Sequence, residues 1–285
     1  MSGEIDAPRV RLELTSRPEA ARLVRSMSSA AGEALGFDPE LLSDVNTAVA
    51  EACNNVILHA YTEEPGPLWV ELGGPADMVE VRIRDYGCGI RQAVPEHDRL
   101  KVGLALMSAL ADRAEFISPP DGGTEVRLSF QHPAPLRPPK ITSALATANG
   151  HGRSGSRRVD LPGDVVLTVS PVTLLGPVLG RLGRTLAPSA GFSLARCYDV
   201  YLLTDVLAAH AEWAAEEGAI SVALGARDRR LEFAVSPLRI GASGRLRDGA
   251  PDAAAGTLAA LSEEIGVSAI DGYETLRVSM RDPLR

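Results

Sequence analysis

The residues best suited to chemistry are a carboxylate and a carboxamide one helical turn apart, Glu51 and Asn55, in the run from Asp44 to Ala60. Apolar residues recur there every three or four positions, which predicts a helix with one buried stripe. Residues four apart share a face, so Glu51, Asn55 and His59 are expected on a second stripe. An Asn oxygen suits a hydrated divalent cation that carries phosphates, and a Glu can take a proton from a nucleophile. A solvated polar face is the plainer alternative for this pair taken alone.

Three glycine-containing turns follow this helix in chain order: Asp85-Tyr86-Gly87-Cys88-Gly89, Lys101-Val102-Gly103 and Gly122-Gly123-Thr124. Glycine lets the backbone approach a ligand closely. The Asp85 carboxylate follows an alternating strand and could accept a hydrogen bond from the amino group of a base. Gly103 is expected at the start of a helix, a place suited to phosphate. Each turn alone has little weight, but four elements in this order favour a nucleotide site.

This order of motifs resembles the GHKL ATPase superfamily, and the run from Glu51 to Tyr61, EACNNVILHAY, is similar to the helix of the bacterial anti-sigma-factor serine kinases. The resemblance covers residues 8 to 130, less than half of the chain. It implies an α+β fold, a two-layer sandwich of the GHKL (Bergerat) type with helices on one side of a mixed or antiparallel sheet. It also implies ATP or ADP with Mg²⁺ as cofactors, and an anti-anti-sigma protein or a sigma factor as partner.

The resemblance assigns roles residue by residue. Glu51 would be the catalytic base that activates the attacking hydroxyl, and Asn55 would be the metal ligand for Mg²⁺. The other positions would bind the nucleotide: Asp85 at the adenine amino group, Gly87 and Gly89 under the nucleotide, Lys101 near the phosphates, Gly103 in a lid over the phosphates, and Thr124 in the adenine network.

Two positions depart from the family pattern. Val56 follows Asn55 where alanine is usual, and Lys101 stands where the first lid glycine is usual. Lys101 could partly compensate for that glycine as a cation near the phosphates.

Composition and charge limit the number of domains, the kind of partner and the redox environment that fit this chain. The chain has 285 residues, 45% of them hydrophobic, which is enough for one large or two ordinary domains. Its formal net charge of -8 argues against nucleic acid as the main partner. No apolar run is long enough to span a bilayer, and the polar, acidic start matches no secretory signal. Three widely spaced cysteines fit free thiols in a reducing cytoplasm.

The sequence of the first half predicts a regular succession of strands and helices around the helix that carries Glu51 and Asn55. A cap at Asp38 is expected to begin that helix, and residues 91–100 fit either a mobile lid or a plain exposed loop. The expected strands are 9–15, 68–72, 79–84, 114–117 and 124–130, and further helices are expected from Pro18 and over 104–111.

A linker rich in Pro, Gly and Ser is expected over 132–160, between domains at 8–131 and 161–285. The second domain is similar to the first in collinear order. Gly36-Phe37 matches Gly191-Phe192 and Asp44-Val45 matches Asp199-Val200, both at an offset of 155 (191−36 and 199−44). The sequence therefore predicts two tandem copies of one fold, with chance similarity of two α+β stretches as the alternative.

The second copy lacks the residues of the nucleotide site. Val206 stands at the position of Glu51, His210 at that of Asn55 and Pro237 at that of Asp85, so we expect one nucleotide per chain. Arg239 replaces Gly87, and Gly241 alone survives from that turn. His210 is taken as structural. Since kinases of this branch usually act as homodimers, the resemblance implies an intramolecular pseudo-dimer of the two domains.

Two classes of function compete for this chain. The first is an ATP-dependent protein serine/threonine kinase that phosphorylates an anti-anti-sigma partner and regulates transcription by partner switching. The second is an ATP-binding module that sequesters a sigma factor or another regulator without phosphotransfer. The intact Glu51 favours the kinase, because a pure binder needs no base, and the missing lid glycine favours the binder.

Overall fold

The computed structural model describes residues 7–75, 77–89, 98–132, 163–216, 218–247, 253–270 and 272–283. The chain divides into two compact units, Met1–Pro138 and Pro139–Arg285, here called the first and second units. Most of the expected lid, residues 91–97, and nearly all of the expected linker lie outside the described residues. No helix within the described ranges is long and apolar enough to cross a membrane.

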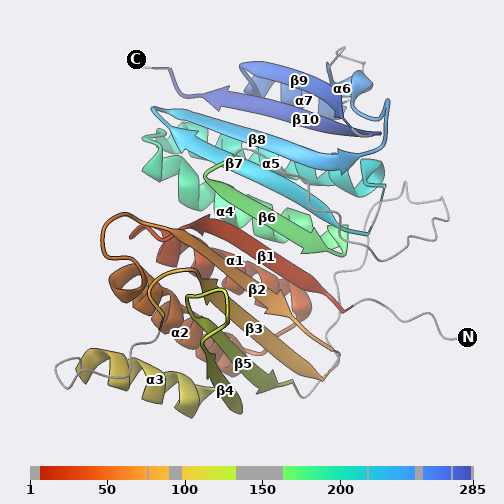
Figure 1. Ribbon diagram of the computed structural model, residues 1–285. Helices are drawn as coiled ribbons and strands as arrows, with labels where there is room; N and C mark the ends of the chain where they lie inside the picture. The colour runs from red at the N-terminus through yellow and green to blue at the C-terminus, as the bar shows by residue number, and fades with distance from the viewer. Residues whose placement is uncertain are drawn as a thin grey trace, which may run out of the picture. The chain divides into compact units, whose positions relative to one another are not determined.

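The first unit is an α+β sandwich in which α1 and α2 cover one face of an antiparallel sheet (Figure 1). The strand order in the sheet is β4-β5-β3-β2-β1, and the predicted α+β class is confirmed. The elements are β1 (Arg9–Thr15), α1 (Ala20–Leu35), α2 (Pro39–Asn55), the π-helix η1 (Val56–Ala60), β2 (Pro67–Gly73), β3 (Met78–Asp85), α3 (Asp98–Leu110), β4 (Arg113–Ile117) and β5 (Glu125–Gln131).

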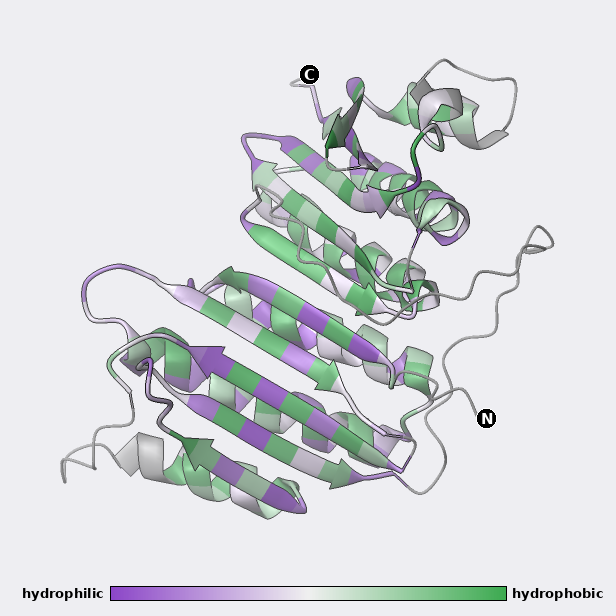
Figure 2. Ribbon diagram, turned by 45° about the vertical axis from the view of Figure 1, so that its right-hand side comes forward, coloured by the Kyte–Doolittle hydropathy of each residue, from purple (hydrophilic) through white to green (hydrophobic). Residues whose placement is uncertain are grey.

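Alternation of apolar and polar residues along the strands accounts for this layering. In β1, Val10, Leu12 and Leu14 are buried while the residues between them are more exposed, because successive side chains of a strand point to opposite faces. Figure 2 shows the same alternation of green and purple along β2 and β3. The apolar face of the sheet packs against the buried stripes of α1 and α2, so one side of the sheet is fixed against helices.

Local signals set the ends of the first two helices. The Asp38 side chain accepts hydrogen bonds from the backbone N–H groups of Glu40 (3.0 Å) and Leu41 (2.9 Å), which confirms the predicted cap of α2. Gly36 closes α1 at φ +86°, a left-handed conformation that favours glycine.

Two predictions about helix geometry are wrong. The helix α3 begins at Asp98, so Gly103 lies in its interior and not at its start. The apolar spacing of Leu104 and Met107 extends back to Leu100 in the sequence, which is why the helix begins earlier. The regular spacing of the motif helix ends at Asn55, where η1 begins, and a π-turn does not continue the four-residue stripe to His59.

The second unit has the same succession of main elements as the first, and its strand order is β6-β7-β8-β10-β9. All described strand pairs within it are antiparallel, and α4 and α5 lie on one face of its sheet (Figure 1). Its elements are β6 (Val165–Ser170), the 3₁₀ turn η2 (Val172–Leu174), α4 (Leu175–Ser189), α5 (Leu194–Ala214), β7 (Ile220–Arg227), β8 (Arg230–Leu238), α6 (Gly244–Arg247), α7 (Ala253–Leu261), β9 (Glu264–Ile270) and β10 (Tyr273–Arg281).

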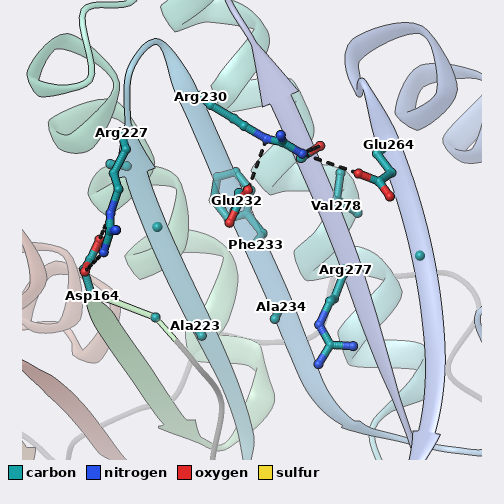
Figure 3. Close-up of a pocket in the computed structure, with 15 residues that line it drawn as sticks. Asp164, Ala223, Arg227, Arg230, Glu232, Phe233, Ala234, Glu264, Arg277 and Val278 are labelled. Atoms are coloured by element: carbon teal, nitrogen blue, oxygen red, sulfur yellow. Dashed lines mark hydrogen bonds and ion pairs between the residues drawn. The ribbon is translucent and has the colours of Figure 1, made fainter.

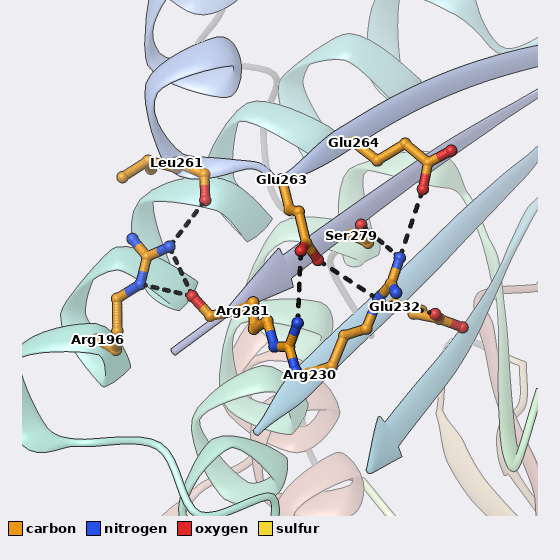
Figure 4. Close-up of polar contacts among 8 residues, drawn as sticks. All are labelled: Arg196, Arg230, Glu232, Leu261, Glu263, Glu264, Ser279 and Arg281. Atoms are coloured by element: carbon orange, nitrogen blue, oxygen red, sulfur yellow. Dashed lines mark hydrogen bonds and ion pairs between the residues drawn. The ribbon is translucent and has the colours of Figure 1, made fainter. Parts of the chain in front are cut away.

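A polar network joins the outer strands of the second unit at one end (Figure 4). The Arg230 guanidinium pairs with the carboxylates of Glu232 (3.1 Å), Glu263 (3.7 Å) and Glu264 (3.4 Å). Arg281 also pairs with Glu263, at 3.8 Å. Exposed ion pairs add little free energy singly, so the network chiefly fixes how β9 meets β8 and β10.

Candidate functional site

The centre of the candidate site is Asp85, the last residue of β3. Its residue is only 2% exposed, and one carboxylate oxygen, Oδ1, accepts from the N–H groups of Gly87 (2.8 Å) and Thr124 (3.2 Å). Burial raises the pKa of Asp85 above its ordinary value, and these backbone hydrogen bonds act against that rise. The two N–H groups fix the direction of the carboxylate, which suits it to accept a hydrogen bond from an amino group.

Glycines pack this turn against neighbouring carbonyl groups. A Cβ on Gly87 would lie 2.0 Å from the carbonyl oxygen of Ala60, and one on Gly123 would lie 2.1 Å from that of Asp85. Gly123 and Gly89 also have φ +75°, which a side chain rarely adopts. A side chain would be strained at these positions, and the backbone of Gly87 and Gly89 stays partly accessible to a ligand while Gly123 is buried.

The π-turn η1 joins the motif helix to this loop. Its last carbonyl, at Ala60, accepts from the N–H of Cys88 at 2.9 Å. The next residue, Tyr61, accepts from the N–H of Tyr86 (2.9 Å) through its hydroxyl, which donates to the carbonyl of Pro67 (2.5 Å). The end of the helix and the Asp85 turn are thus locked together, and π-turns often occur at functional sites.

Sequence reasoning gave Tyr61 no role, and it also missed an ion pair behind the turn. The buried Arg84 guanidinium donates to the Asp121 carboxylate at 2.7 Å and lies 4.8 Å from the ring centre of Tyr86. Since successive strand residues point to opposite faces, Arg84 holds the Gly122-Gly123-Thr124 turn from the side away from the Asp85 carboxylate. A basic residue directly before the Asp-x-Gly-x-Gly motif was the available signal.

Glu51 and Gly103 meet where α3 passes over α2. A Cβ on Gly103 would lie 2.2 Å from the Glu51 Oε1 atom, so a side chain at this position would displace the Glu51 carboxylate. Asn55 is half-buried one turn along α2, where the π-turn begins. Lys101 belongs to the first turn of α3, and its side chain lies outside the description.

The site residues therefore form two groups, one where α3 meets the end of α2 and one at the turn after β3. Glu51, Asn55 and Gly103 make one group, and Asp85 with its glycines and Thr124 makes the other, joined through η1. The neutral oxygen of Asn55 and the nearby carboxylates suit a magnesium nucleotide, since Mg²⁺ takes one or two protein oxygens and completes its shell with phosphates and water. No cluster of three His, Cys, Asp or Glu residues suited to a metal occurs in the described part of the chain, and this mode of Mg²⁺ binding needs none.

A separate pocket of about 720 Å³ lies in the second unit on the sheet face opposite to its helices (Figure 3). Three arginines and three carboxylates line it, and two of the arginines are paired there. Arg227 binds Asp164 through two hydrogen bonds (2.7 and 3.2 Å), and Arg230 belongs to the network of Figure 4. None of the candidate nucleotide residues lines this pocket, and its balanced charge favours no ionic ligand.

The second unit differs most from the first at the corresponding turn. Glu274 stands where the first unit has Thr124, at the offset of 150 that relates β10 to β5 (276−126). Its buried carboxylate accepts from the N–H groups of Gly241 (2.6 Å) and Ser243 (2.9 Å). His210 Nε2 lies 3.2 Å from the Ser243 hydroxyl oxygen. The N–H groups of this turn are thus satisfied by a carboxylate from a neighbouring strand, whereas in the first unit they bind the carboxylate that ends β3.

Comparison with known proteins identifies the class that this fold and site define. The family model described as a histidine kinase-like ATPase domain matches residues 14–130. An anti-sigma F factor from Oceanobacillus iheyensis is 33% identical over 108 residues, 33% of this chain and 74% of that protein. An anti-sigma F factor from Clostridium perfringens is 30% identical over 129 residues, 41% of this chain and 92% of that protein.

A third relative, the serine-protein kinase RsbW of Bacillus cereus, is 25% identical over 118 residues, 36% of this chain and 74% of that protein. The chain belongs to the histidine-kinase-like (GHKL) ATPase superfamily, in its anti-sigma-factor kinase branch. These three alignments span at most 41% of the chain.

Proposed function

We propose that the chain is an ATP- and Mg²⁺-dependent protein serine/threonine kinase. Its substrate would be an anti-anti-sigma protein, and phosphorylation would control a sigma factor by partner switching. The observation that carries the proposal is the contact of Glu51 with Gly103 one turn from Asn55, because it sets a carboxylate between a metal-binding amide and a lid helix. The names of the relatives, anti-sigma F factor and serine-protein kinase, support the same partners and chemistry.

In this proposal each residue has one task. Asp85 accepts a hydrogen bond from the adenine amino group, and Asn55 holds the Mg²⁺ that neutralises phosphate charge. Glu51 takes the proton of the partner's Ser or Thr hydroxyl as that oxygen bonds to the γ-phosphorus and the bond to the leaving ADP breaks. The glycines at 87, 89 and 103 keep backbone close to the nucleotide.

The second candidate is an ATP-loaded switch that sequesters a sigma factor without phosphotransfer. One observation favours it: Lys101 stands in place of a lid glycine, in the first turn of α3. A lid without that glycine has less freedom to close over the γ-phosphate. A binder would use Asp85 and Asn55 in the same way and would leave Glu51 without a task.

A pull-down from the native cytoplasm, with and without ATP and Mg²⁺, separates the two candidates. The recovered partner is analysed for phosphoserine and phosphothreonine by mass spectrometry. The kinase predicts a small partner that is phosphorylated only with ATP and Mg²⁺, and Glu51→Gln should abolish the mark while retaining the partner. Recovery of an unmodified sigma factor under both conditions would favour the binder.

We further propose that residues 161–285 are a degenerate second copy of the domain at 8–131, joined by the linker 132–160. The common strand order and the collinear sequence matches support this assignment. Since Val206, His210 and Pro237 replace Glu51, Asn55 and Asp85, we expect one nucleotide per chain. Titration calorimetry that finds two would contradict it, and Asp85→Asn should weaken the single site.

Finally, we propose that the two domains pair as a pseudo-two-fold dimer within one chain. A coil of about 25 residues has an r.m.s. reach of roughly 25–30 Å, which allows such a pairing. Tethering replaces a concentration-dependent association by an intramolecular one at an effective concentration of about millimolar. Small-angle scattering of isolated monomers tests this: a compact profile supports the pair, and an extended, flexible one contradicts it.

A further inference from the structure

The pocket on the open face of the second unit's sheet has a floor of small side chains. Ala223 on β7 and Ala234 on β8 are cross-strand partners (Figure 3), and Val166 on β6 packs against them. The row continues across the strands through Arg277 on β10 to Gly266 on β9. None of the described residues that line this pocket belongs to a helix. We call this row of five residues the sheet trough.

The first unit carries long charged side chains where the trough has Val166 and the two alanines. The matching residues are Arg11, Glu71 and Arg82, at offsets of 155 (166−11) and 152 (223−71 and 234−82). Arg11 pairs with the Glu13 carboxylate at 3.0 Å on the same strand. The same row of the same topology is thus filled by charged side chains in one unit and hollow in the other. The small side chains therefore form the trough, and the course of the strands does not.

The floor of the trough has almost no surface in contact with water. Ala223 is 2% exposed and Ala234 is 7% exposed. A sheet face that is open to solvent is polar as a rule, as it is in the first unit. A dry row of valine and alanine on a face without a described helix indicates that this face binds further chain.

The chain itself enters the trough at Gly163. Val165 of β6 pairs with Leu224 of β7, and a straight continuation of this register would put Gly163 opposite Ala226. Instead, a Cβ on Gly163 would lie 2.9 Å from the Cβ of Ala223 and 3.3 Å from the backbone N and O atoms of Leu224. The chain before β6 therefore leaves the plane of the sheet on the side of the trough.

An ion pair holds the chain in this direction. The Asp164 carboxylate accepts two hydrogen bonds from the Arg227 guanidinium, at 2.7 and 3.2 Å. Two parallel hydrogen bonds fix the orientation of a carboxylate as well as its position. Both side chains are exposed, so the pair directs the chain more than it stabilises the fold.

The residues that precede Gly163 have a sequence suited to this surface. Residues 157–162 read Arg-Arg-Val-Asp-Leu-Pro. A proline disfavours the helical conformation in the residue before it, so Pro162 favours an extended chain at Leu161. Side chains two apart share one face of an extended chain, which puts Val159 and Leu161 together. The segment therefore offers one apolar edge to an apolar floor.

The length and charge of this segment also match the trough. Five strands about 4.8 Å apart give a row about 19 Å long, which about six extended residues would cross. Counted back from Gly163, Leu161 would meet the floor over β8 and Val159 would meet it over β10. Arg157 would then reach β9, where the Glu264 carboxylate is exposed.

We propose that residues 157–162 bind as an extended segment across the sheet trough of their own second unit. Val159 and Leu161 fill the space that charged side chains fill in the first unit, and Arg157 pairs with Glu264. Binding within one chain needs only a weak contact, because the segment is tethered to the trough through Gly163. The tether between the two units would then end at residue 156.

This contact does not depend on the proposed kinase activity or on the pairing of the two units. It involves no residue of the nucleotide site, and a binder would have it as well as a kinase. The contact can therefore fail while the proposed function stands, and the reverse.

Limited trypsin digestion of the full chain, with mass spectrometry of the early fragments, tests the proposal. Trypsin cleaves after Lys140 and Arg153, which precede the proposed segment, and after Arg157 and Arg158, which belong to it. A bound segment is cleaved only from the fraction of molecules in which it has left its surface. In wild type, cleavage after Arg157 and Arg158 should be at least about tenfold slower than at the other two bonds.

Two variants should remove this protection. Ala223→Glu/Ala234→Arg installs the first unit's own residues in the trough, and Leu161→Ser removes an apolar contact without touching the sheet. Each should raise the cleavage rate of the two protected bonds at least about fivefold. Ala209→Arg is the matched control, since Ala209 is an exposed alanine on α5, and it should leave the pattern unchanged. Circular dichroism confirms that each variant is folded.

Three outcomes would overturn the proposal. Equal cleavage rates at all four bonds of wild type would show that the segment is not bound. Protection that persists in both variants would show that another surface covers it. Protection that grows with protein concentration would show that the segment of a second copy occupies the trough, and binding within one chain would be wrong.

Discussion

The first and second units have one strand order but different turns after the third strand. In the first unit the turn after β3 joins an Asp to glycines that pack against carbonyls. In the second unit the turn after β8 is bound by Glu274 from a neighbouring strand. Both sheets keep their buried Val and Leu positions. The two units thus share a strand order and an apolar core but differ in the residues of this turn, so the same arrangement of strands does not require the same residues there.

The helices α3 and α7 also differ between the two units, in how closely their glycines are packed. In α3, Gly103 touches Glu51, whereas Gly256 at the matching place in α7 has no atom within 4 Å of an added Cβ. A methyl group on Gly103 would displace the Glu51 side chain, which occupies the space beside it. The second unit retains a glycine that its packing does not require.

The largest expected effect is the loss of phosphotransfer when Glu51 is replaced, compared with replacement of Val206 at the matching position of the second unit. Glu51→Gln should keep ATP affinity and lower phosphotransfer about 10²–10⁴-fold, the usual contribution of a positioned base. Val206→Ala should leave the rate unchanged, because the second unit has no base to lose. Single-turnover assays with the recovered partner measure both. A Gln variant that works at the wild-type rate would remove Glu51 from the mechanism.

Asp85→Asn should weaken nucleotide binding by about 1–3 kcal/mol, roughly 5–150-fold, because a charged acceptor becomes a neutral amide. The matched change in the second unit, Glu274→Gln, should leave nucleotide affinity as it is. Calorimetry with ADP and Mg²⁺ tests the pair. Equal losses of nucleotide affinity in both variants would contradict the assignment of the single site to the first unit. Absence of binding by the wild type at millimolar ATP would contradict the nucleotide hypothesis itself.

Gly103→Ala and Gly256→Ala form a third pair. The first substitution places a methyl group against the Glu51 carboxylate and should lower phosphotransfer about tenfold by displacing the base, a cost of about 1.4 kcal/mol in the transition state. The second should raise stability by about 0.5–1 kcal/mol, since alanine is the better helix former. Kinetics and thermal unfolding measure the two effects. Equal tolerance at both positions would contradict the close contact in the first unit.

The smallest expected effect is the pH dependence of stability that comes from Glu274 in the second unit. Burial alone would raise the pKa of Glu274, but hydrogen bonds from Ser243 and Gly241 outweigh it and lower the pKa below the ordinary value of 4.5. Stabilisation by Glu274 is therefore complete above pH 4.5 and is lost as the pH falls below it. Thermal unfolding of wild type should lose more stability than Glu274→Gln over that acidic range. Parallel curves would show that the carboxylate contributes nothing.

Sequence analysis predicted the features that depend on neighbouring residues or on periodic patterns. The strands, the Asp38 cap and the order of the motifs follow from patterns within a few residues of each feature, and the structure agrees with them. The start of α3 was missed because a charged stretch with Pro95 precedes it and hides the periodicity. The roles of residues in the site remain predictions that binding and kinetics must test.

What could not be predicted depends on contacts between distant parts of the chain. The π-turn η1 is stabilised by Cys88, which donates to Ala60 from 28 residues further along (88−60). The links from Tyr61 to Tyr86 and from Arg84 to Asp121 likewise join separate loops. A pattern in one sequence reports the spacing of residues along a single element. It carries no information about contacts between residues far apart in the chain.

The open surroundings of Gly256 and Gly241 have a consequence for the history of the chain. An added Cβ meets no atom within 4 Å at either position, although Gly241 has φ +81°. Steric selection against replacement is therefore weaker at Gly256 than at Gly87 and Gly123, where a methyl group would strike a carbonyl oxygen, while the left-handed φ of Gly241 still favours glycine. Among descendants of this gene, the two halves should diverge at different rates, with the glycines of the first half changing least.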